Sequence, residues 1–383
     1  MIGAAFRCAA RRSNRMRIAF LTGIWPPDVG GPATHGPDFS RFLASRGHHV
    51  HVVTMGDGEP TERPCEVEVV SRRLPFPLRY GAVAVRGARA ARRADVLYAS
   101  ATYAAAAVAA AISRRPLVAK LVSDPAYERA QRYGLFSGTL EEFQQARSRP
   151  ARMLKALRTA SLRRAATLVV PSAYLAEIAA GWGLRRERIH VLTNPAPPPR
   201  EIEPETLEDG TFVFVGRLTR QKALGTAIEA VARVPEARFV LVGDGPERVA
   251  LERAASASAA SDRIRFLGTR SRDEALRTVA GACAALLSSD WENLPHSAVE
   301  ALSVGVPVVS TAVGGVPEVV RDGENGLLVP PGRPEELAAA IRRVLDEPGL
   351  RERLAAGAKP SVEAISSEAI YSRLETLLAE AAR

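Results

Sequence analysis

Two glutamates, Glu292 and Glu300, flank a proline-led helix start in the run Ser288–Glu300. The run follows an apolar strand, at the end where open α/β sheets bind their ligands. Pro295 suits the first turn of a helix, which leaves the backbone amides of Asn293, Leu294 and His296 as donors beside the positive end of the helix dipole. A carboxylate accepts two hydrogen bonds from a vicinal diol such as ribose. The run therefore predicts an anion- or sugar-binding pocket bordered by two carboxylates.

A solvated helix face is the commoner setting for an isolated glutamate. For Glu300 the surroundings argue otherwise, because its helix continues through Ala301 and Leu302 and runs into the apolar strand Val306–Val309. We therefore keep Glu300 as a candidate binding residue.

A second group of residues, 216–222, places Arg217 and Lys222 on one predicted strand-to-helix loop that opens at Gly216. Arginine offers a planar fork for phosphate oxygens, and lysine offers a mobile point charge. Together they can clamp a diphosphate and neutralise it as a leaving group. For this segment alone, two solvated surface cations are the commoner interpretation.

Glycine pairs end two other strands. Gly30 and Gly31 follow the first strand, and their conformational freedom permits a close backbone approach to a ligand. Their spacing is not GxGxxG, so a dinucleotide fingerprint is not supported. Gly314 and Gly315 form a similar close-approach turn, which is weak evidence by itself. His35, near the start of the first helix, is either a ligand contact or an exposed side chain.

The sequence offers little for metal or covalent chemistry. No Asp-x-Asp pair stands at a strand end to hold a divalent ion on a diphosphate, and no GxSxG, P-loop or HExxH run occurs. The cysteines Cys8, Cys65 and Cys283 lie far apart, without the spacing of a metal site. We expect no metal and no cofactor, and a reduced, cytoplasmic setting.

Short apolar runs alternate with amphipathic stretches, the signature of βαβ units and parallel sheets. Strands are predicted at Arg17–Thr22, His49–Thr54, Val67–Val70, Val96–Tyr98, Leu117–Val122, Thr167–Val170, Ile189–Leu192, Thr211–Val215, Arg238–Val242, Ile264–Leu267, Ala284–Leu287, Val306–Ser310 and Gly326–Val329.

The chain of 383 residues suits two α/β domains better than one. Asn194–Pro199 is too rich in proline for a helix or a central strand, and an acidic run follows it. We predict a first domain over 16–195, a linker over 196–210, a second domain over 211–362 and an amphipathic helix over 363–383. Residues 1–15 are basic, lack the apolar core of a secretory signal and precede Met16, so we expect a disordered extension or a wrongly assigned start.

The two halves differ in charge. Residues 1–195 hold 30 basic and 14 acidic residues, a net +16, whereas residues 196–383 hold 22 and 28, a net −6. Such a difference suits domains with different partners. No apolar run approaches the ~20 residues that a membrane span needs. Basic and aromatic residues are not interleaved, and no reader motif occurs, which argues against nucleic acid.

Together these stretches resemble glycosyltransferase family 4, retaining enzymes of the GT-B fold. The resemblance covers Met16 to the C-terminus and is strongest over Phe212–Val329. The motifs that carry it are Gly216-Arg217 with Lys222, Val242-Gly243-Asp244-Gly245-Pro246, Phe266-Leu267-Gly268, Glu292 with Glu300, Gly314-Gly315-Val316-Pro317-Glu318 and Asp322-Gly323-x2-Gly326. It implies an α/β GT-B fold, with two Rossmann-like domains facing each other across a cleft and a C-terminal helix that crosses back to the first domain.

The resemblance also implies roles. The donor would be a nucleotide-diphosphate sugar, UDP- or GDP-linked, and the first domain would bind the acceptor. Arg217 and Lys222 would hold the diphosphate, Glu300 the ribose hydroxyls, and Glu292 would face the donor sugar. Further donor contacts would come from Gly30, Gly31, Gly216, Gly268, Asn293 and Leu294. The family implies same-face attack without a metal, with the leaving phosphate helping to deprotonate the acceptor hydroxyl.

One position departs from the family. Its members commonly carry a histidine after the strand that corresponds to Leu117–Val122, near the reacting sugar, and this chain has Asp124 there. An acid at this place would hydrogen-bond a sugar hydroxyl or assist the acceptor. Asp124 therefore joins Glu292, Arg217 and Lys222 as a candidate catalytic residue, but the role of the histidine does not transfer.

The segment Arg147–Ala165 interleaves seven basic residues with apolar ones, including Met153 and Leu157. A basic amphipathic helix of this kind can lie on an anionic membrane. It would bring the protein to the inner face of the plasma membrane and suit a lipid-linked acceptor. A solvated face in an arginine-rich chain explains the pattern equally well.

We therefore predict a glycosyltransferase that moves a hexosyl unit from a nucleotide-diphosphate sugar to a hydroxyl of a glycan or lipid-linked acceptor, with retention of configuration. The alternative is a catalytically weak sugar-nucleotide-binding subunit of a polysaccharide assembly complex, if Asp124 cannot replace the histidine. A nicotinamide oxidoreductase would need GxGxxG after the first strand, which is absent.

Overall fold

The computed structural model describes residues 15–28, 31–198 and 201–383. The predicted extension up to residue 14 and Gly30 lie outside these residues. Each strand predicted from the sequence is present, with its ends within two residues of the predicted ones. The strands are β1 (Arg17–Thr22), β2 (His49–Gly56), β3 (Glu66–Ser71), β4 (Val96–Ser100), β5 (Leu117–Lys120), β6 (Thr167–Val170), β7 (Ile189–Val191), β8 (Thr211–Val215), β9 (Arg238–Val242), β10 (Ile264–Gly268), β11 (Ala284–Leu287), β12 (Val308–Thr311) and β13 (Gly326–Val329).

Helices fill most of the connections between these strands. They are α1 (Gly31–Ser45), α2 (Phe76–Arg92), α3 (Tyr103–Ser113), α4 (Pro125–Arg132), α5 (Leu140–Gln145), α6 (Arg149–Leu162), α7 (Ala173–Ala180), α8 (Leu224–Ala232), α9 (Arg248–Ser256), α10 (Arg272–Ala280), α11 (His296–Ser303), α12 (Pro334–Asp346), α13 (Leu350–Val362) and α14 (Ser367–Ala381). Among the described helices, none is long and apolar enough to cross a bilayer.

The strands form two sheets. One has seven strands in the order β3-β2-β1-β4-β5-β6-β7, and the other has six in the order β10-β9-β8-β11-β12-β13. The neighbouring strands run parallel, for example β1 with β2 and β8 with β11. In each sheet the order reverses beside the first strand, between β1 and β4 and between β8 and β11. Ligands of open α/β sheets bind beyond the carboxyl ends of the strands at such a reversal.

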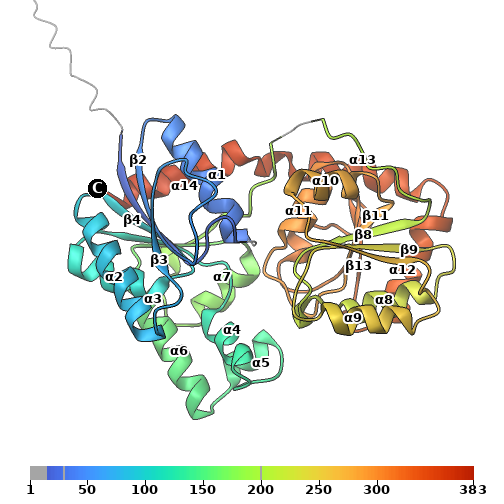
Figure 1. The fold of residues 1–383 in the computed structure, drawn as a ribbon, viewed down its shortest axis with the longest axis horizontal. Helices are drawn as coiled ribbons and strands as arrows, with labels where there is room; N and C mark the ends of the chain where they lie inside the picture. The colour runs from blue at the N-terminus through green and yellow to red at the C-terminus, as the bar shows by residue number, and fades with distance from the viewer. Residues whose placement is uncertain (1–14, 29–30, 199–200) are drawn as a thin grey trace, which may run out of the picture. The chain divides into compact units, whose positions relative to one another are not determined.

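Side chains that alternate along β8 build a core on each face of the six-stranded sheet. Phe212 and Phe214 lie in one buried cluster with residues of α8 and α12. Val213, between them, lies in another with residues of α10, α11 and α13. Successive strand residues point to opposite faces, so the two clusters are the two covered faces of a parallel sheet. Figure 1 shows α8, α9 and α12 on one side of this sheet and α10, α11 and α13 on the other.

The seven-stranded sheet follows the same rule at β1. Phe20 faces α1, where Gly36 leaves room for the rings of Phe20 and Trp25, and Leu21 faces α2, where Gly87 leaves room for its methyl groups. A Cβ at Gly87 would lie 2.7 Å from a Leu21 methyl carbon, closer than real contacts allow. The small residue is therefore what lets α2 approach the sheet.

The chain separates into two compact units. One comprises residues 1–119, 161–167 and 375–383, and the other comprises 120–160 and 168–374. These units divide the chain differently from the predicted domains, so the boundaries at 195 and 210 stay predictions. The end of α14 belongs to the first unit, where Glu375 Oε1 lies 2.8 Å from His48 Nε2. The last helix thus returns to the first unit, as predicted.

Candidate active site

The loop between β11 and α11 carries the candidate sugar-binding residues. Pro295 is the N-cap of α11, one position before the first turn in which the sequence placed it. Glu292, Asn293 and Leu294 are buried, with exposed fractions of 5–7%. The loop leaves β11 at the reversal beside β8, the position at which such sheets bind ligands.

The glycine turn after β12 shapes this loop. A Cβ at Gly314, whose φ is +54°, would lie 1.7 Å from the carbonyl oxygen of Glu292, and a Cβ at Gly315 would lie 1.9 Å from that of Asn293. Neither atom could be accommodated without moving the backbone. The turn therefore makes the close approach that the sequence predicts, and it approaches the backbone carbonyls of Glu292 and Asn293 in the candidate site.

Lys222 and Glu292 form an ion pair between the loops that follow β8 and β11. Ser289 Oγ also donates to Glu292 Oε1 at 2.8 Å, and Gln221 Nε2 to its Oε2 at 3.3 Å. The lysine side chain is 15% exposed and the glutamate 7%. The backbone amide of Asp290 adds a bond to the Gln221 carbonyl at 2.9 Å. The adjacency of β8 and β11 thus brings the two predicted residues together.

Glu300 pairs with an arginine that the sequence did not single out. Arg272, at the start of α10, places Nε and Nη2 each 3.1 Å from Glu300 Oε1. The glutamate side chain is 21% exposed, so it borders solvent rather than the core. A planar fork on a carboxylate fixes the orientation of both groups.

His296 is the first residue of α11, and its pKa is affected by cations from both ion pairs, Lys222–Glu292 and Arg272–Glu300. Its pKa is lowered to about 3, first by burial and then by the nearby cations Lys120, Arg272 and Lys222. The imidazole is therefore neutral at physiological pH. Lys120 ends β5 as a buried side chain, and burial lowers its pKa to about 7. Lys120, Arg272 and Lys222 thus lie near the start of α11.

Gly216 follows β8 and Gly268 ends β10, the two strands that flank β9 in the sheet. A Cβ at Gly243 would lie 1.9 Å from the Gly216 carbonyl oxygen, and the Gly243 amide donates to the carbonyl of Gly268 at 2.8 Å. Gly268 adopts a φ of +69°. The close contacts among Gly216, Gly243 and Gly268 therefore hold together the loops after β8, β9 and β10. Arg217, on the first of these loops, is exposed.

Asp124 is buried, with 1% of its surface exposed. Its Oδ1 caps α4 by accepting the amides of Ala126 at 2.8 Å and Tyr127 at 3.3 Å. Its Oδ2 accepts Gln144 Nε2 at 3.0 Å and Arg158 Nη1 at 2.6 Å. Both carboxylate oxygens are thus engaged by protein donors.

The residues around Asp124 reach the candidate site. The ring of Tyr127 packs edge-on against Trp291, with centroids 5.3 Å apart, and Asn293 Nδ2 donates to the carbonyl of Val122 at 2.6 Å. The segment that contains Asp124 therefore contacts the residues on both sides of Glu292. This connection could not be predicted from the sequence, because its contacts join residues more than 150 positions apart that share no motif.

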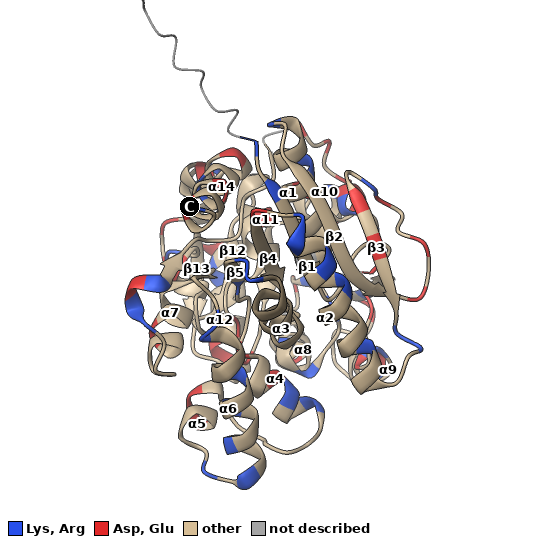
Figure 2. Ribbon diagram, turned by 90° about the vertical axis from the view of Figure 1, so that its left-hand side faces the viewer, with Lys and Arg blue, Asp and Glu red and all other residues tan. Residues whose placement is uncertain are grey.

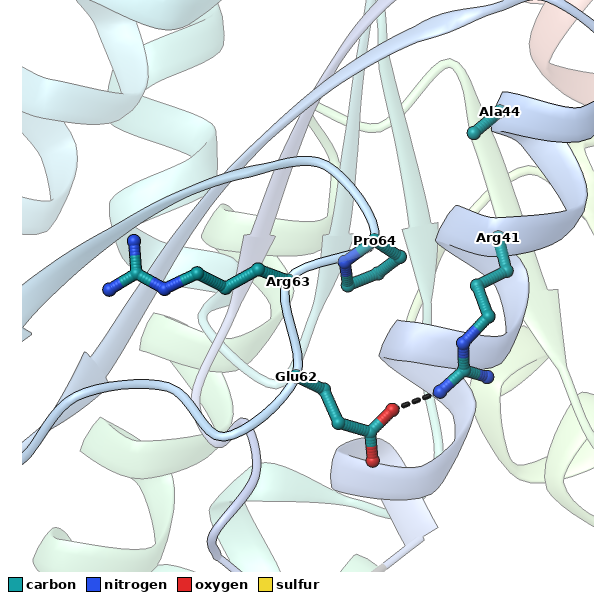
Figure 3. A pocket seen from close by; sticks show the side chains of 5 residues that line it. All are labelled: Arg41, Ala44, Glu62, Arg63 and Pro64. Atoms are coloured by element: carbon teal, nitrogen blue, oxygen red, sulfur yellow. Dashed lines mark hydrogen bonds and ion pairs between the residues drawn. The ribbon is translucent and has the colours of Figure 1, made fainter.

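Other predicted residues take different places. Gly31 opens α1. His35 is buried, 4% exposed, and its Nε2 lies 2.9 Å from the Tyr98 hydroxyl, so it is not the exposed side chain that the sequence allowed. A surface hollow on the first unit, lined by Arg41, Ala44, Glu62, Arg63 and Pro64, contains none of the predicted site residues; Arg41 and Glu62 form an ion pair across it (Figure 3). Within the described residues, no group of His, Cys, Asp and Glu side chains is arranged to hold a metal.

Comparison with known proteins supports the resemblance. The family model "Glycosyltransferase Family 4" matches residues 29–199, and the model "Glycosyl transferases group 1" matches residues 198–360. The alpha-D-kanosaminyltransferase of Streptomyces kanamyceticus is 35% identical over 159 residues, 40% of this chain and 41% of that enzyme. The lipopolysaccharide core biosynthesis glycosyltransferase LpsE of Rhizobium meliloti is 36% identical over 212 residues, 54% of this chain and 62% of LpsE. The matched stretches thus span less than two thirds of either relative.

A solved structure supports the fold. The crystal structure of Anabaena Alr3699/HepE in complex with UDP-glucose superposes with a TM-score of 0.76, at 21% identity, over 96% of this chain and 100% of that one. The transferase names of the relatives do not favour the alternative of a catalytically weak binding subunit. With two Rossmann-like sheets, the motif set and both family models, the chain belongs to glycosyltransferase family 4.

Proposed function

We propose that this enzyme transfers a hexosyl unit from a nucleotide-diphosphate sugar to a hydroxyl of a glycan or lipid-linked acceptor, with retention of configuration. The observation that carries the proposal is the pairing of Lys222 with Glu292 beside the start of α11, with Glu300 of the same helix paired to Arg272 at the start of α10. The HepE structure contains UDP-glucose, which supports a UDP-linked donor. A GDP-linked donor is the other candidate.

In this proposal each charged residue has a distinct task. Lys222 and Arg217 neutralise the diphosphate, so that the bond from the sugar C1 to the phosphate oxygen can break. Glu292 accepts hydrogen bonds from sugar hydroxyls, and Glu300 accepts them from the ribose. The backbone at Gly216, Gly268, Asn293 and Leu294 completes the donor site. The acceptor oxygen bonds to C1 on the same face, and its proton passes to the departing phosphate.

The burial of Asp124 supports a role in positioning. Its oxygens already accept four hydrogen bonds, and the segment it organises contacts Trp291 and Asn293. We propose that Asp124 acts by holding the Glu292 loop, and that direct contact with the sugar is the alternative to be tested.

Peripheral membrane contact is a further part of the proposal. Basic residues recur along α6 (Figure 2), and the apolar side chains Met153 and Leu157 are 66% and 47% exposed. However, Lys155 Nζ caps the end of α5 by donating to the Ala146 carbonyl at 2.6 Å, and Arg158 pairs with Asp124. Fewer basic side chains of α6 are therefore available to contact a membrane than the sequence predicts. Co-sedimentation of the Met153→Ser/Leu157→Ser variant with anionic vesicles tests it, and binding equal to wild type would exclude α6.

The central experiment measures donor binding and turnover. A thermal-shift screen with UDP-, GDP- and ADP-sugars should identify the base, and release of nucleoside diphosphate with acceptor should report transfer. Lys222→Ala and Glu300→Ala should each lower turnover by a factor of ~10². Lys359→Ala, on the exposed surface of α13, is the control. Near-wild-type turnover in both site variants would refute the assignment.

A further inference from the structure

An exposed apolar segment follows β3. Leu74, Phe76 and Leu78 are 38%, 50% and 63% exposed, and they alternate with Pro75 and Pro77. Each proline fixes its own φ and restricts the residue before it. The segment therefore has few alternative conformations in which these side chains could turn inward.

Arg72 anchors the segment to two neighbouring loops. Its guanidinium grips both carboxylate oxygens of Asp28, with one bond of 2.9 Å, and its backbone amide donates to Asp57 Oδ1 at 3.0 Å. Arg79 Nη1 donates back to the Arg72 carbonyl at 2.8 Å. Asp28 follows β1 and Asp57 follows β2, so the loops after three adjacent strands are tied together.

This anchoring fixes the apolar side chains at the ligand-binding edge. Open α/β sheets bind ligands beyond the carboxyl ends of their strands, and β1, β2 and β3 all end here. Fixed apolar groups in water forgo about 25 cal/mol for every Å² left exposed, so covering these three side chains with a ligand or partner is favourable. The Phe76 ring also packs on Tyr80, with centroids 4.7 Å apart, which extends the surface.

The charge beside this surface points to the kind of ligand. The charge of Arg72 is offset by Asp28, and their hydrogen bond raises the pKa of Arg72. Arg73 is exposed, and its side chain makes no hydrogen bond or ion pair within the part of the chain that the structure describes. A hydrocarbon surface beside a cation that no acid among the described residues offsets, Arg73, complements a molecule that joins a hydrocarbon chain to an anionic group.

We infer that Leu74, Phe76 and Leu78 bind the hydrocarbon part of an amphiphilic acceptor, whose anionic group lies at Arg73. This inference rests on the proposed transferase function and narrows its acceptor to one class. It places acceptor recognition on the connection from β3 to α2 and on the first turn of α2. This connection is tied to Asp28, in the loop that carries the glycine pair.

The test uses decyl phosphate below its micelle concentration, with inorganic phosphate and decyl maltoside as partial probes, measured by calorimetric titration. Wild type should bind decyl phosphate more tightly than either partial probe. Phe76→Ser/Leu78→Ser should weaken that binding roughly 10- to 100-fold, because most of two side-chain contacts is lost. Arg73→Gln should bring the affinity for decyl phosphate close to that for decyl maltoside. Val249→Ser, an apolar position 57% exposed on α9, is the matched control and should bind like wild type.

Donor binding separates this inference from the proposed function. UDP should stabilise wild type and the Phe76→Ser/Leu78→Ser variant equally, which shows that the donor site is intact in both. If wild type binds UDP but binds decyl phosphate no better than inorganic phosphate, the acceptor inference is overturned and the transferase assignment stands. Binding to anionic vesicles without binding to monomeric decyl phosphate would also overturn it, because the segment would then be a membrane contact. Failure to bind any nucleotide sugar counts against the proposed function instead.

Discussion

The buried pair of Asp124 and Arg158 permits a decisive substitution. Asp124→Asn keeps a good N-cap for α4 but removes the charge that faces Arg158, whose side chain is 4% exposed. Breaking one partner of a buried ion pair costs about 3–5 kcal/mol, because the other charge stays buried without compensation. For a unit of this size that corresponds to a melting temperature lower by about 6–20 °C.

The second substitution restores the balance. Arg158→Met removes the stranded charge and keeps an unbranched side chain over the Trp182 ring, where the guanidinium carbon lies 3.7 Å from the ring centroid. Apolar replacement of a whole buried pair is often close to neutral. Asp124→Asn/Arg158→Met should therefore recover most of the lost stability, and with it the packing of Tyr127 on Trp291.

Activity then decides between positioning and catalysis. Thermal unfolding followed by circular dichroism gives the stability of each variant, and nucleoside diphosphate release gives kcat and KM. If Asp124 acts by holding the Glu292 loop, the double variant recovers kcat together with its melting temperature. If the double variant folds like wild type but its kcat stays at the level of the Asp124→Asn variant, the carboxylate acts on the substrate and the positioning argument is refuted.

Three further predictions test the site. Gly314→Ala should abolish the thermal stabilisation by UDP, because its Cβ would lie 1.7 Å from a carbonyl oxygen of the sugar-binding loop, whereas Gly323→Ala, with a φ of +76° but nothing within 4 Å, should retain it; equal responses would contradict the account. Arg272→Gln should weaken UDP binding more than 2′,3′-dideoxy-UDP binding, because it frees Glu300 from its fork; equal losses would rule out ribose recognition through this pair. The pKa of His296 falls from 6.5 to about 3 on folding, so the unfolded chain binds more protons between these values; stability contributed by the neutral imidazole is complete above pH 6.5 and is lost as the pH falls toward 3. His296→Asn should reduce the change in unfolding free energy between pH 6.5 and pH 3, measured by denaturant unfolding at several pH values. An unchanged pH dependence would contradict this prediction.

The sequence predicted the strands well, because each is a short apolar run between polar or glycine-rich connections. The resemblance placed Lys222 and Glu292 in one donor site, and the adjacency of β8 and β11 brings the two side chains together. The resemblance also implied that the final helix crosses back, and the end of α14 belongs to the first unit.

Long-range side-chain pairing was beyond the sequence. From the sequence, Asp124 was expected to be available to the substrate. Its partner Arg158 was not recognised, because it lies on a helix whose basic residues suggested a membrane-facing surface. Arg272 followed a serine cap and carried no motif, so its bond to Glu300 went unseen. In each case the charge pattern was readable, but the direction in which each side chain points depends on how the helices pack.

The close approach of the Gly314–Gly315 turn to the carbonyls of Glu292 and Asn293 matters for anyone redesigning donor choice. Randomising the turn would distort the backbone of the proposed sugar-binding loop, so such libraries should yield mostly inactive clones. The side chains of Ser289 and Gln221 donate hydrogen bonds to the carboxylate of Glu292. They are the positions where diversity can alter selectivity while the scaffold survives.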